Sequence, residues 1–262
     1  MSSLNGILSN YTYLFIIIFI RYLGIFLISP IFGSKMILSR LKVGITLLLT
    51  FITFPVLKQT YSLKIPEKAI LIVGDLVQEL AIGFLIGFLV FLFFAAIQLA
   101  GQFIDLRMGF RIANVFDPLT GASSPVIGQF KNIMVTLIFL TINGHHKLIN
   151  SIFKSFDVIP LGEVSFNNQL WQFIFRKSGD LFIIAFEIAL PVMGTIFIVD
   201  VILGFLARSV PQMNIFIVGL PVKILIGFII IFLSLHIVIN YYQHGLDQVF
   251  KDIMKLIKLM EP

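Results

Sequence analysis

Four ionisable side chains interrupt the hydrophobic segments of this sequence, and these are the first residues whose chemistry needs an explanation. They are Arg21, Glu79, Glu187 and Asp200. An ionised group at membrane depth is costly unless it is paired or hydrated, so such residues face other helices or water. They either pair with one another or with neighbouring subunits, or they couple the movement of an ion, as in a transporter. The sequence has no dense acidic cluster and no evident inverted repeat, which favours pairing.

A second concentration of charge lies in residues 101–121, GQFIDLRMGFRIANVFDPLTG, between two very hydrophobic segments. Its glycines and its proline permit non-helical backbone, which at membrane depth is tolerated only inside protein or beside water. We expect Arg107 and Arg111 to pair with Asp105 and Asp117. The stretch is therefore predicted to be a compact, irregular loop.

Catalytic and metal-binding signatures are missing from the sequence. There is no HExxH, no GxSxG and no phosphate-binding P-loop. There is also no cysteine, which excludes disulfides, thiolate nucleophiles and cysteine-ligated metals. His145 and His146 are adjacent, so on a helix they point about 100° apart and make a poor metal pair. We predict no enzyme, no cofactor and no metal site.

The composition places the chain among membrane proteins. Hydrophobic residues make up 58% of the 262 residues and charged residues 12%, and the mean hydropathy is +1.04. A soluble domain carries roughly 25% charged residues, so this chain cannot cover itself with a polar surface. The net charge of +6 is spread among loops. It indicates contact with membrane lipid and gives no sign of nucleic-acid binding.

The hydrophobic pattern predicts an all-α protein with about six apolar helices in one unit. One segment, 69–100, would be about 48 Å long as a helix, against a hydrocarbon core of about 30 Å. It must tilt, bend or project beyond the bilayer. Basic residues divide almost evenly between the two sides that simple alternation predicts, so they give no orientation. The expected segments are 11–31, 41–57, 69–100, 126–143, 178–208 and 215–241.

Two polar features accompany the last two segments, one between them and one after them. The connection between them is expected to be a wet hairpin tip, with Pro211 and Pro221 interrupting the helices. The C-terminal residues 242–262 are amphipathic and are predicted to lie on a membrane or to dock on a partner, because their lysines and apolar residues occupy separate helical faces. The candidate residues at the hairpin tip are Arg208, Pro211, Gln212, Met213 and Asn214.

Three stretches resemble the FliR family, the flagellar members of the type III export-gate proteins. They are GQFIDLRMGFRIANVFDPLTGASSPVIGQF, FLTINGHHKLINSIFKSFDVIPLG and ARSVPQMNIFIVGLPVKILIG. The resemblance extends from about Phe15 to about Leu233, and the PQMN block and the NGHH segment are more similar to flagellar than to virulence-secretion members.

The resemblance implies a subunit packed with FliP-like and FliQ-like proteins in a helical core complex, through which unfolded flagellar subunits leave the cytoplasm. Residues 1–177 would be a FliP-like portion that contains a plug loop at 101–125. Residues 178–241 would be a FliQ-like helical hairpin, followed by the amphipathic tail. The expected location is the inner membrane, within the flagellar basal body. Members of the family sit largely raised out of the bilayer plane, which would explain the overlong helix.

Two site hypotheses follow from the resemblance. The loop would plug the export channel, because hydrophobic constrictions exclude water and ions; the alternative is a loop that links two helices and binds neighbouring subunits. The hairpin tip would contact FlhB-like and FlhA-like components at the cytoplasmic entrance. Two other functions stay open: a secondary transporter that uses Glu79, Glu187 or Asp200, and a virulence-type gate. The candidate plug residues are Asp105, Arg107, Met108, Gly109, Phe110, Arg111, Phe116, Asp117, Pro118 and Gly121.

Overall fold

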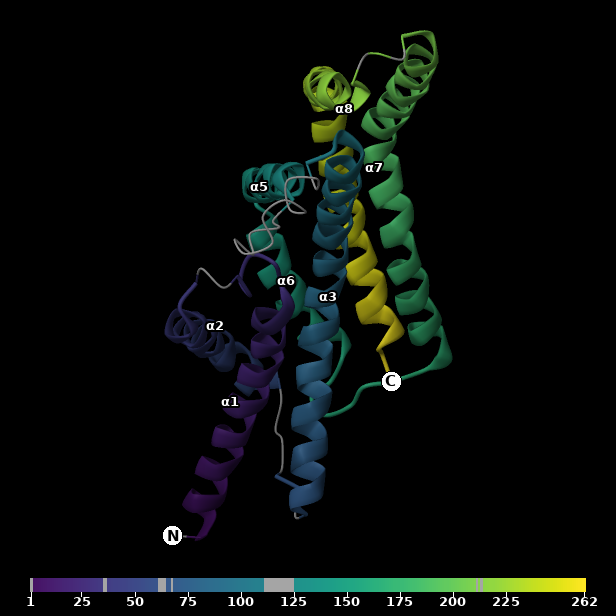
Figure 1. Cartoon of the computed structure of the whole chain (residues 1–262). Coiled ribbons are helices and arrows are strands. Elements are labelled where there is room, and N and C mark those ends of the chain that lie inside the picture. The colour runs from purple at the N-terminus through teal and green to yellow at the C-terminus, as the bar shows by residue number, and fades with distance from the viewer. Residues whose placement is uncertain are drawn as a thin grey trace. The chain divides into compact units, whose positions relative to one another are not determined.

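The computed structural model describes residues 2–34, 37–60, 65–66, 68–110, 125–210, 212 and 214–262. Every regular element in these ranges is an α-helix (Figure 1), which confirms the all-α prediction. The helices are α1 (Ser2–Ile28), α2 (Ser39–Thr60), α3 (Ala69–Met108), α5 (Val126–Thr141), α6 (Gly144–Val158), α7 (Asn168–Ser209) and α8 (Ile215–Leu259).

Five of these helices are long and apolar enough to cross a membrane, and the count rises to six if α5 and α6 are taken as one broken span. The prediction of about six hydrophobic helices is therefore confirmed. The three longest, α3, α7 and α8, have 40, 42 and 45 residues. At about 1.5 Å per residue each exceeds the roughly 30 Å of a hydrocarbon core. The third segment was expected to be longer than the hydrocarbon core, and the structure shows that α7 and α8 are too long as well.

Several predicted boundaries are wrong, and in each case a helix continues through polar residues. α3 runs on to Met108, so the first eight residues of the expected irregular loop are helical. The polar connection after residue 143 forms α6 and the start of α7. Pro221 lies inside α8, where it removes one backbone hydrogen bond without ending the helix.

The chain divides into two compact units, and neither is continuous in sequence. Unit 1 consists of Met1–Leu92, Asn143–Arg176 and Asp247–Pro262; unit 2 consists of Phe93–Ile142 and Lys177–Leu246. Both units have cores of aliphatic and aromatic side chains, although α3, α7 and α8 each contribute residues to both units. Buried residues of unit 1 include Ile17, Ile18, Ile86, Phe156 and Leu256, and those of unit 2 include Ile97, Ile104, Phe139, Ile196 and Leu246.

In unit 1, α1 packs on α2 and crosses α3 at glycines. A Cβ atom on Gly24 would lie 2.6 Å from the carbonyl oxygen of Leu80, and one on Gly83 would collide with the carbonyl oxygen of Arg21. Real Cβ atoms do not approach backbone this closely. Glycine at both positions therefore allows the two helix backbones to touch, as small residues do at crossings of membrane helices.

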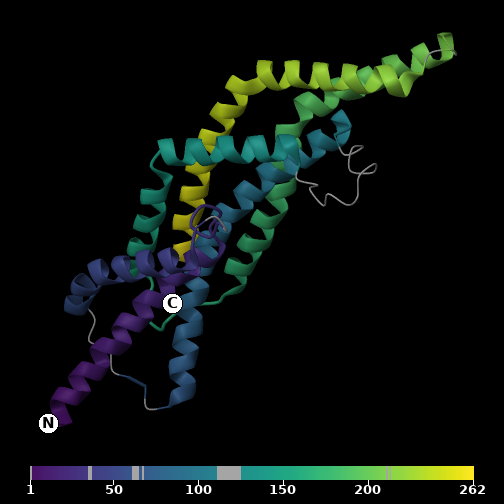
Figure 2. The same cartoon turned by 60° about the vertical axis from the view of Figure 1, so that its left-hand side comes forward.

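In unit 2, α7 and α8 form an antiparallel hairpin whose two arms are visible in Figure 2. Two polar contacts join the arms, one between Tyr241 and Glu187 and one between Lys223 and Asp200. A narrow stripe of the hairpin's apolar side chains is buried, while most of its large apolar side chains stay exposed.

The C-terminal stretch is the end of α8 and packs within unit 1. Its lysines occupy the exposed face, as predicted, and Ile253, Ile257 and Met260 are fully buried. The backbone carbonyl of Met260 accepts a hydrogen bond from Ser165, at 3.1 Å. The prediction that this apolar stripe lies on a membrane or a partner is wrong, because the stripe is covered by the chain's own helices.

Candidate gating and subunit-contact site

The charged stretch after the apolar part of α3 begins as the last turns of that helix, and the helix ends at a glycine. Gly109 has a φ of 88°, in the region that favours glycine. The N–H of Phe110 donates to the carbonyl oxygen of Asp105 at 3.0 Å. A six-to-one bond across a left-handed glycine is the Schellman arrangement that ends many helices. Gly109 therefore stops α3, whereas Gly101, which was expected to loosen the backbone, lies inside the helix.

Asp105 is buried and its carboxylate binds the start of α5. The N–H of Ile127 donates to Oδ1 at 3.1 Å, and the N–H of Gly128 donates to Oδ2 at 3.4 Å. These groups are the second and third residues of α5, and the first N–H groups of a helix have no partner inside it. A carboxylate at this end also interacts favourably with the helix dipole. These contacts make Asp105 a cap for a second helix, a role that was not predicted. Its expected pairing with an arginine stays a prediction.

The last residues of α3 pack on α8 within unit 2. Met108 is fully buried, and a Cβ atom on Gly227 would lie 2.7 Å from its sulfur atom. The ring of Phe110 meets the ring of Phe228 edge-on, with centroids 6.1 Å apart. Two of the candidate plug residues thus contact the chain's own hairpin. Arg107 is exposed on the other side of the helix end.

The remaining candidate plug residues lie outside the described residues. They are Arg111, Phe116, Asp117, Pro118 and Gly121. The plug hypothesis and the ion pairs of Arg111 and Asp117 stay predictions.

Arg21 and Glu79 form a fully buried ion pair in unit 1, at the glycine crossing of α1 and α3. Arg21 also donates to Ser155 Oγ at 3.2 Å and to the carbonyl oxygen of Ile159 at 3.3 Å. Glu79 accepts a further hydrogen bond from the N–H of Gly162, at 2.9 Å. The pair therefore ties α1, α3 and the end of α6 together. The interpretation that membrane-depth charges pair with one another is confirmed for these two residues.

The other two of the four residues singled out in the sequence, Glu187 and Asp200, each contact the opposite arm of the hairpin in unit 2. The hydroxyl of Tyr241 donates to Glu187 Oε2 at 2.7 Å. Lys223 forms an ion pair with Asp200, and both side chains are about one-third exposed or less. Neither Tyr241 nor Lys223 was predicted as a partner, because the register of α7 against α8 cannot be read from the sequence.

The hairpin tip is exposed where the structure describes it. Arg208, Gln212 and Asn214 are all exposed, and Asn214 starts α8 by accepting the N–H of Ile217 at its backbone oxygen, 3.1 Å away. The other two candidate tip residues, Pro211 and Met213, lie outside the described residues.

Large apolar surfaces of the hairpin and of α2 are uncovered in the single chain. In the most apolar window of each helix, 22% of α2, 33% of α7 and 17% of α8 is buried, against 67% of α3. Exposed apolar patches of this extent mark contacts with lipid or with other proteins. Phe175, Phe205, Ile217, Phe232 and Ile237 are each about 70% exposed or more.

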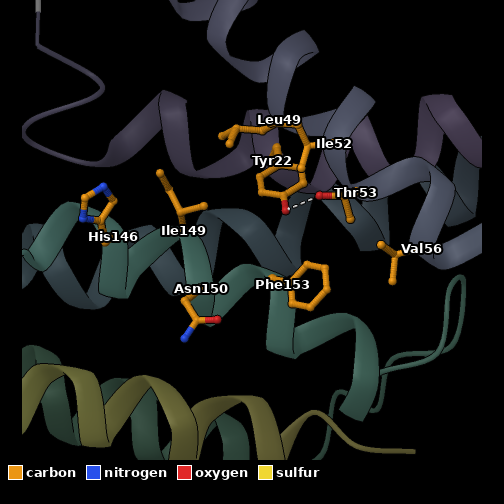
Figure 3. A pocket seen from close by; sticks show the side chains of 9 residues that line it. All are labelled: Tyr22, Leu49, Ile52, Thr53, Val56, His146, Ile149, Asn150 and Phe153. Carbon is orange, nitrogen blue, oxygen red and sulfur yellow. Dashed lines mark hydrogen bonds between the residues drawn. The ribbon is translucent and has the colours of Figure 1, made fainter.

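A groove between α2 and α6 in unit 1 was not predicted from the sequence. It encloses about 390 Å³ and is floored by Tyr22, whose hydroxyl bonds Thr53 Oγ1 at 2.8 Å (Figure 3). His146 and Phe153 of α6 form one wall. Its lining comes from α1, α2 and α6, and α6 is far from the other two helices in the chain, so no local pattern could reveal the groove. No group of three or more histidine, aspartate or glutamate residues in the described part of the chain is placed to hold a metal ion.

Comparison with known proteins decides the family. Residues 12–249 match the family described as Bacterial export proteins, family 1. The chain belongs to the bacterial export proteins, family 1. It is 36% identical over 249 residues to the flagellar biosynthetic protein FliR of Bacillus subtilis (strain 168). The aligned region covers 94% of this chain and 95% of that protein.

Two further relatives show the breadth of family 1. The FliR protein of Pectobacterium carotovorum subsp. carotovorum is 32% identical over 232 residues, 88% of each chain. The secretion system apparatus protein SsaT of Salmonella typhimurium is 26% identical over 226 residues, 86% of this chain and 87% of that protein. Membership in family 1, together with the apolar helices, makes this chain a multi-pass membrane protein of an export apparatus. Such membership also implies partnership with other components of that apparatus.

Proposed function

We propose that this chain is a non-catalytic core subunit of a flagellar type III export gate, where it lines and plugs the channel through which unfolded flagellar subunits pass. The observation that carries the proposal is the family match over residues 12–249, supported by FliR relatives that align over nearly the whole chain. The apolar helices support a place among other membrane subunits, because they leave wide surfaces uncovered.

The proposed neighbours are FliP-like and FliQ-like subunits in the inner membrane, at the flagellar basal body. Residues 1–177 would act as a FliP-like portion, and residues 178–241 as a FliQ-like hairpin. A change of compact unit at Arg176 and Lys177 supports this division, although unit 2 also contains residues 93–142. The exposed tip at Arg208, Gln212 and Asn214 would meet FlhB-like and FlhA-like components at the cytoplasmic entrance. Crosslinks from this tip to periplasmic components alone would contradict that orientation.

The transporter alternative has less support. A coupling carboxylate has to be reachable by an ion, whereas Glu79 is fully buried and bonded by both Arg21 and Gly162. Glu187 and Asp200 each contact a residue of the other hairpin arm. SsaT is a related family member that fits the virulence-type alternative, and it is less similar to this chain than the two FliR proteins.

Co-purification tests the proposed function. A tag at the C-terminus of this chain is expected to recover FliP-like and FliQ-like proteins from membranes in constant proportion. The matched control is the same tag on an unrelated multi-pass protein of the same membrane. Recovery of this chain alone, stable and active in moving small solutes in vesicles, would contradict the gate and support the transporter.

Conductance tests the plug. Residues 105–110 belong to the α3 end and its contacts with α8, so they should be left intact. Replacement of residues 111–124 by glycine and serine, at unchanged length, removes the apolar side chains together with Arg111, Asp117 and Pro118. The assembled complex with this replacement is expected to leak ions in planar bilayers, whereas Asp180→Asn, which alters an ion pair within α7 and outside the loop, should not leak. Unchanged conductance after the replacement would count against the plug.

A further inference from the structure

We propose that the exposed proline faces of α2 and α7 are contact sites for helices of neighbouring subunits, and that a polar side chain of the neighbour donates a hydrogen bond to a main-chain carbonyl oxygen at each site. The two acceptors are the carbonyl oxygens of Phe51 and Glu187. The inference rests on the proposed function and adds to it the chemistry that the neighbouring helices must carry.

Pro55 and Pro191 each leave one carbonyl oxygen without its helical donor. Pro55 lies inside α2 and Pro191 lies inside α7. In a regular α-helix, the N–H groups at these positions would donate to the carbonyl oxygens four residues earlier, which belong to Phe51 and Glu187. Proline has no N–H, and its ring pushes against that same carbonyl group. Each helix therefore has one acceptor whose usual partner is missing.

Side chains of the same helix do not replace the missing donor. Serine and threonine hydroxyls in a helix reach carbonyl oxygens three or four residues earlier. The residues at these distances are a phenylalanine and Pro55 in α2, and a leucine and Pro191 in α7, so none of them carries a donor. Thr195, one turn further along α7, donates to the carbonyl oxygen of Pro191 at 2.8 Å. Within the part of the chain that the structure describes, no side chain donates to the carbonyl oxygen of Phe51 or Glu187.

Both acceptors lie on exposed faces of apolar helices. Phe51 is 68% exposed, and Pro55 on the same face of α2 is exposed as well. In α7, Glu187 and Pro191 are both exposed. Each of these helices is long and apolar enough to cross a membrane. The two carbonyl groups therefore meet whatever covers α2 and α7, and not the interior of this chain.

Lipid chains cannot supply the missing hydrogen bonds. Hydrocarbon carries no donor, and proline is tolerated in a membrane helix where a neighbouring helix, a hydroxyl or an ordered water satisfies the freed carbonyl. Phe51 lies between Lys42 and Lys58, about 10–14 Å along the helix from each, so lipid headgroups and bulk water are distant. Glu187 is an exposed ionisable residue, and such residues at membrane depth face protein or water instead of lipid. A helix with a polar side chain meets the requirement at both sites.

Pro221 of α8 does not carry the same inference. It frees the carbonyl oxygen of Ile217, which lies three residues after Asn214 at the exposed hairpin tip. Water can donate to a carbonyl group at such a tip. The proposal is therefore confined to the acceptors of α2 and α7.

Photocrosslinking in the assembled complex tests the proposal. A photoreactive phenylalanine analogue at Phe51 or at Phe186, which is 51% exposed and precedes Glu187, lies beside one of the two acceptors. We expect crosslinks to a helix of another subunit, with a hydroxyl, amide or basic side chain within one turn of the crosslinked residue. A neighbouring helix with apolar residues alone at that place would overturn the inference.

The crosslinked product also separates this inference from the proposed function. Crosslinks to lipid alone at both positions, in a complex that still contains FliP-like and FliQ-like subunits, would overturn the inference and leave the gate standing. Recovery of this chain without any partner subunit would contradict the proposed function itself.

A double-mutant comparison tests the hydrogen bond. Replacement of the neighbour's donor, as identified by the crosslink, with alanine should lower recovery of that neighbour several-fold. Pro55→Ala or Pro191→Ala supplies the missing N–H, so the same replacement should then have little further effect, because coupled sites are not additive. Val56→Ala and Leu190→Ala are the matched controls. Each position is 51% exposed and neither change supplies an N–H, so the several-fold loss should persist.

An equal several-fold loss with the proline variants and with the controls would overturn the hydrogen bond. The crosslinking result does not depend on the proline variants, so it decides the case if those variants fail to assemble.

Discussion

Arg21 and Glu79 show how a charge is accommodated in an apolar helix bundle. Both side chains are fully buried. Beyond the ion pair, Glu79 accepts a hydrogen bond from the N–H of Gly162, and Arg21 donates one to Ser155 Oγ. The guanidinium group also lies 4.2 Å from the ring centre of Phe156. A buried pair need not stabilise a fold more than apolar residues would, but one charge left alone is strongly destabilising.

Removal of one partner of this pair is therefore predicted to lower the free energy of unfolding more than removal of both partners. Arg21→Met leaves Glu79 buried with one hydrogen bond and should lower the free energy of unfolding by about 3–5 kcal/mol. The double variant Arg21→Met, Glu79→Leu should recover most of that loss. Thermal unfolding of the purified complex measures both. A double variant no more stable than the single one would contradict the predicted penalty for leaving Glu79 unpaired.

At this scale the sequence predicts which residues need partners and fails to predict the partners. Arg21 and Glu79 stand out because they are charged in apolar segments, and pairing was the expected result. Ser155 and Gly162 could not be foreseen, since they lie some 80 or more residues from the groups they bond. The capping of α5 by Asp105 was not predicted, because it depends on a tertiary approach that the sequence around Pro125 does not reveal.

At the scale of elements, the crossing of α1 and α3 depends on backbone contact. Gly24 and Gly83 face each other there, and neither has room for a Cβ atom. Glycine costs a helix about 1 kcal/mol relative to alanine, so these positions are kept small for packing and not for helix formation.

Alanine substitutions in α3 should separate packing from helix propensity. Gly83→Ala would push against the carbonyl oxygen of Arg21 and is expected to destabilise unit 1 by about 1–3 kcal/mol. Gly74→Ala, in the same helix with nothing within 4 Å, should be neutral or stabilising by up to about 1 kcal/mol. Midpoints of thermal unfolding for the two variants compare the effects. Equal midpoints would argue against a backbone contact at Gly83.

The hairpin register is predicted to depend on Asp200 and Lys223. Asp200→Lys places two lysines opposite each other on α7 and α8 and should reduce secretion of flagellar subunits several-fold. The reversal Asp200→Lys, Lys223→Asp should restore secretion. Asp180→Lys is the control and should have little effect, because Asp180 pairs with Lys177 within α7 and that pair does not join the two arms. If the reversal fails to restore secretion, the pair has another role besides joining the arms.

Hydrophobic periodicity predicts the centres of these helices well, because long apolar runs have no other stable form in a membrane. It predicts their ends poorly. α3 continues through Asp105 and Arg107 until Gly109 stops it, and the polar residues after Asn143 form a helix because their apolar residues pack inside unit 1. The tail of α8 was read correctly as amphipathic, yet its apolar face is used within the chain.

At the scale of the molecule, the length and the exposed apolar surfaces of the helices favour a subunit that packs against other proteins. Three are longer than a bilayer is thick, and α2, α7 and α8 expose most of their apolar residues. A single lipid-embedded chain could cover those surfaces with lipid, whereas a gate subunit would cover them with other helices. The family match over residues 12–249 favours the second arrangement.

An electron microscopy map of the complex purified through this chain tests that arrangement most directly. We predict a helical conduit in which the exposed faces of α2, α7 and α8 contact other subunits, with residues 111–124 inside the conduit. A map that shows this chain alone in detergent, with those faces bare and residues 111–124 turned outward, would contradict the account.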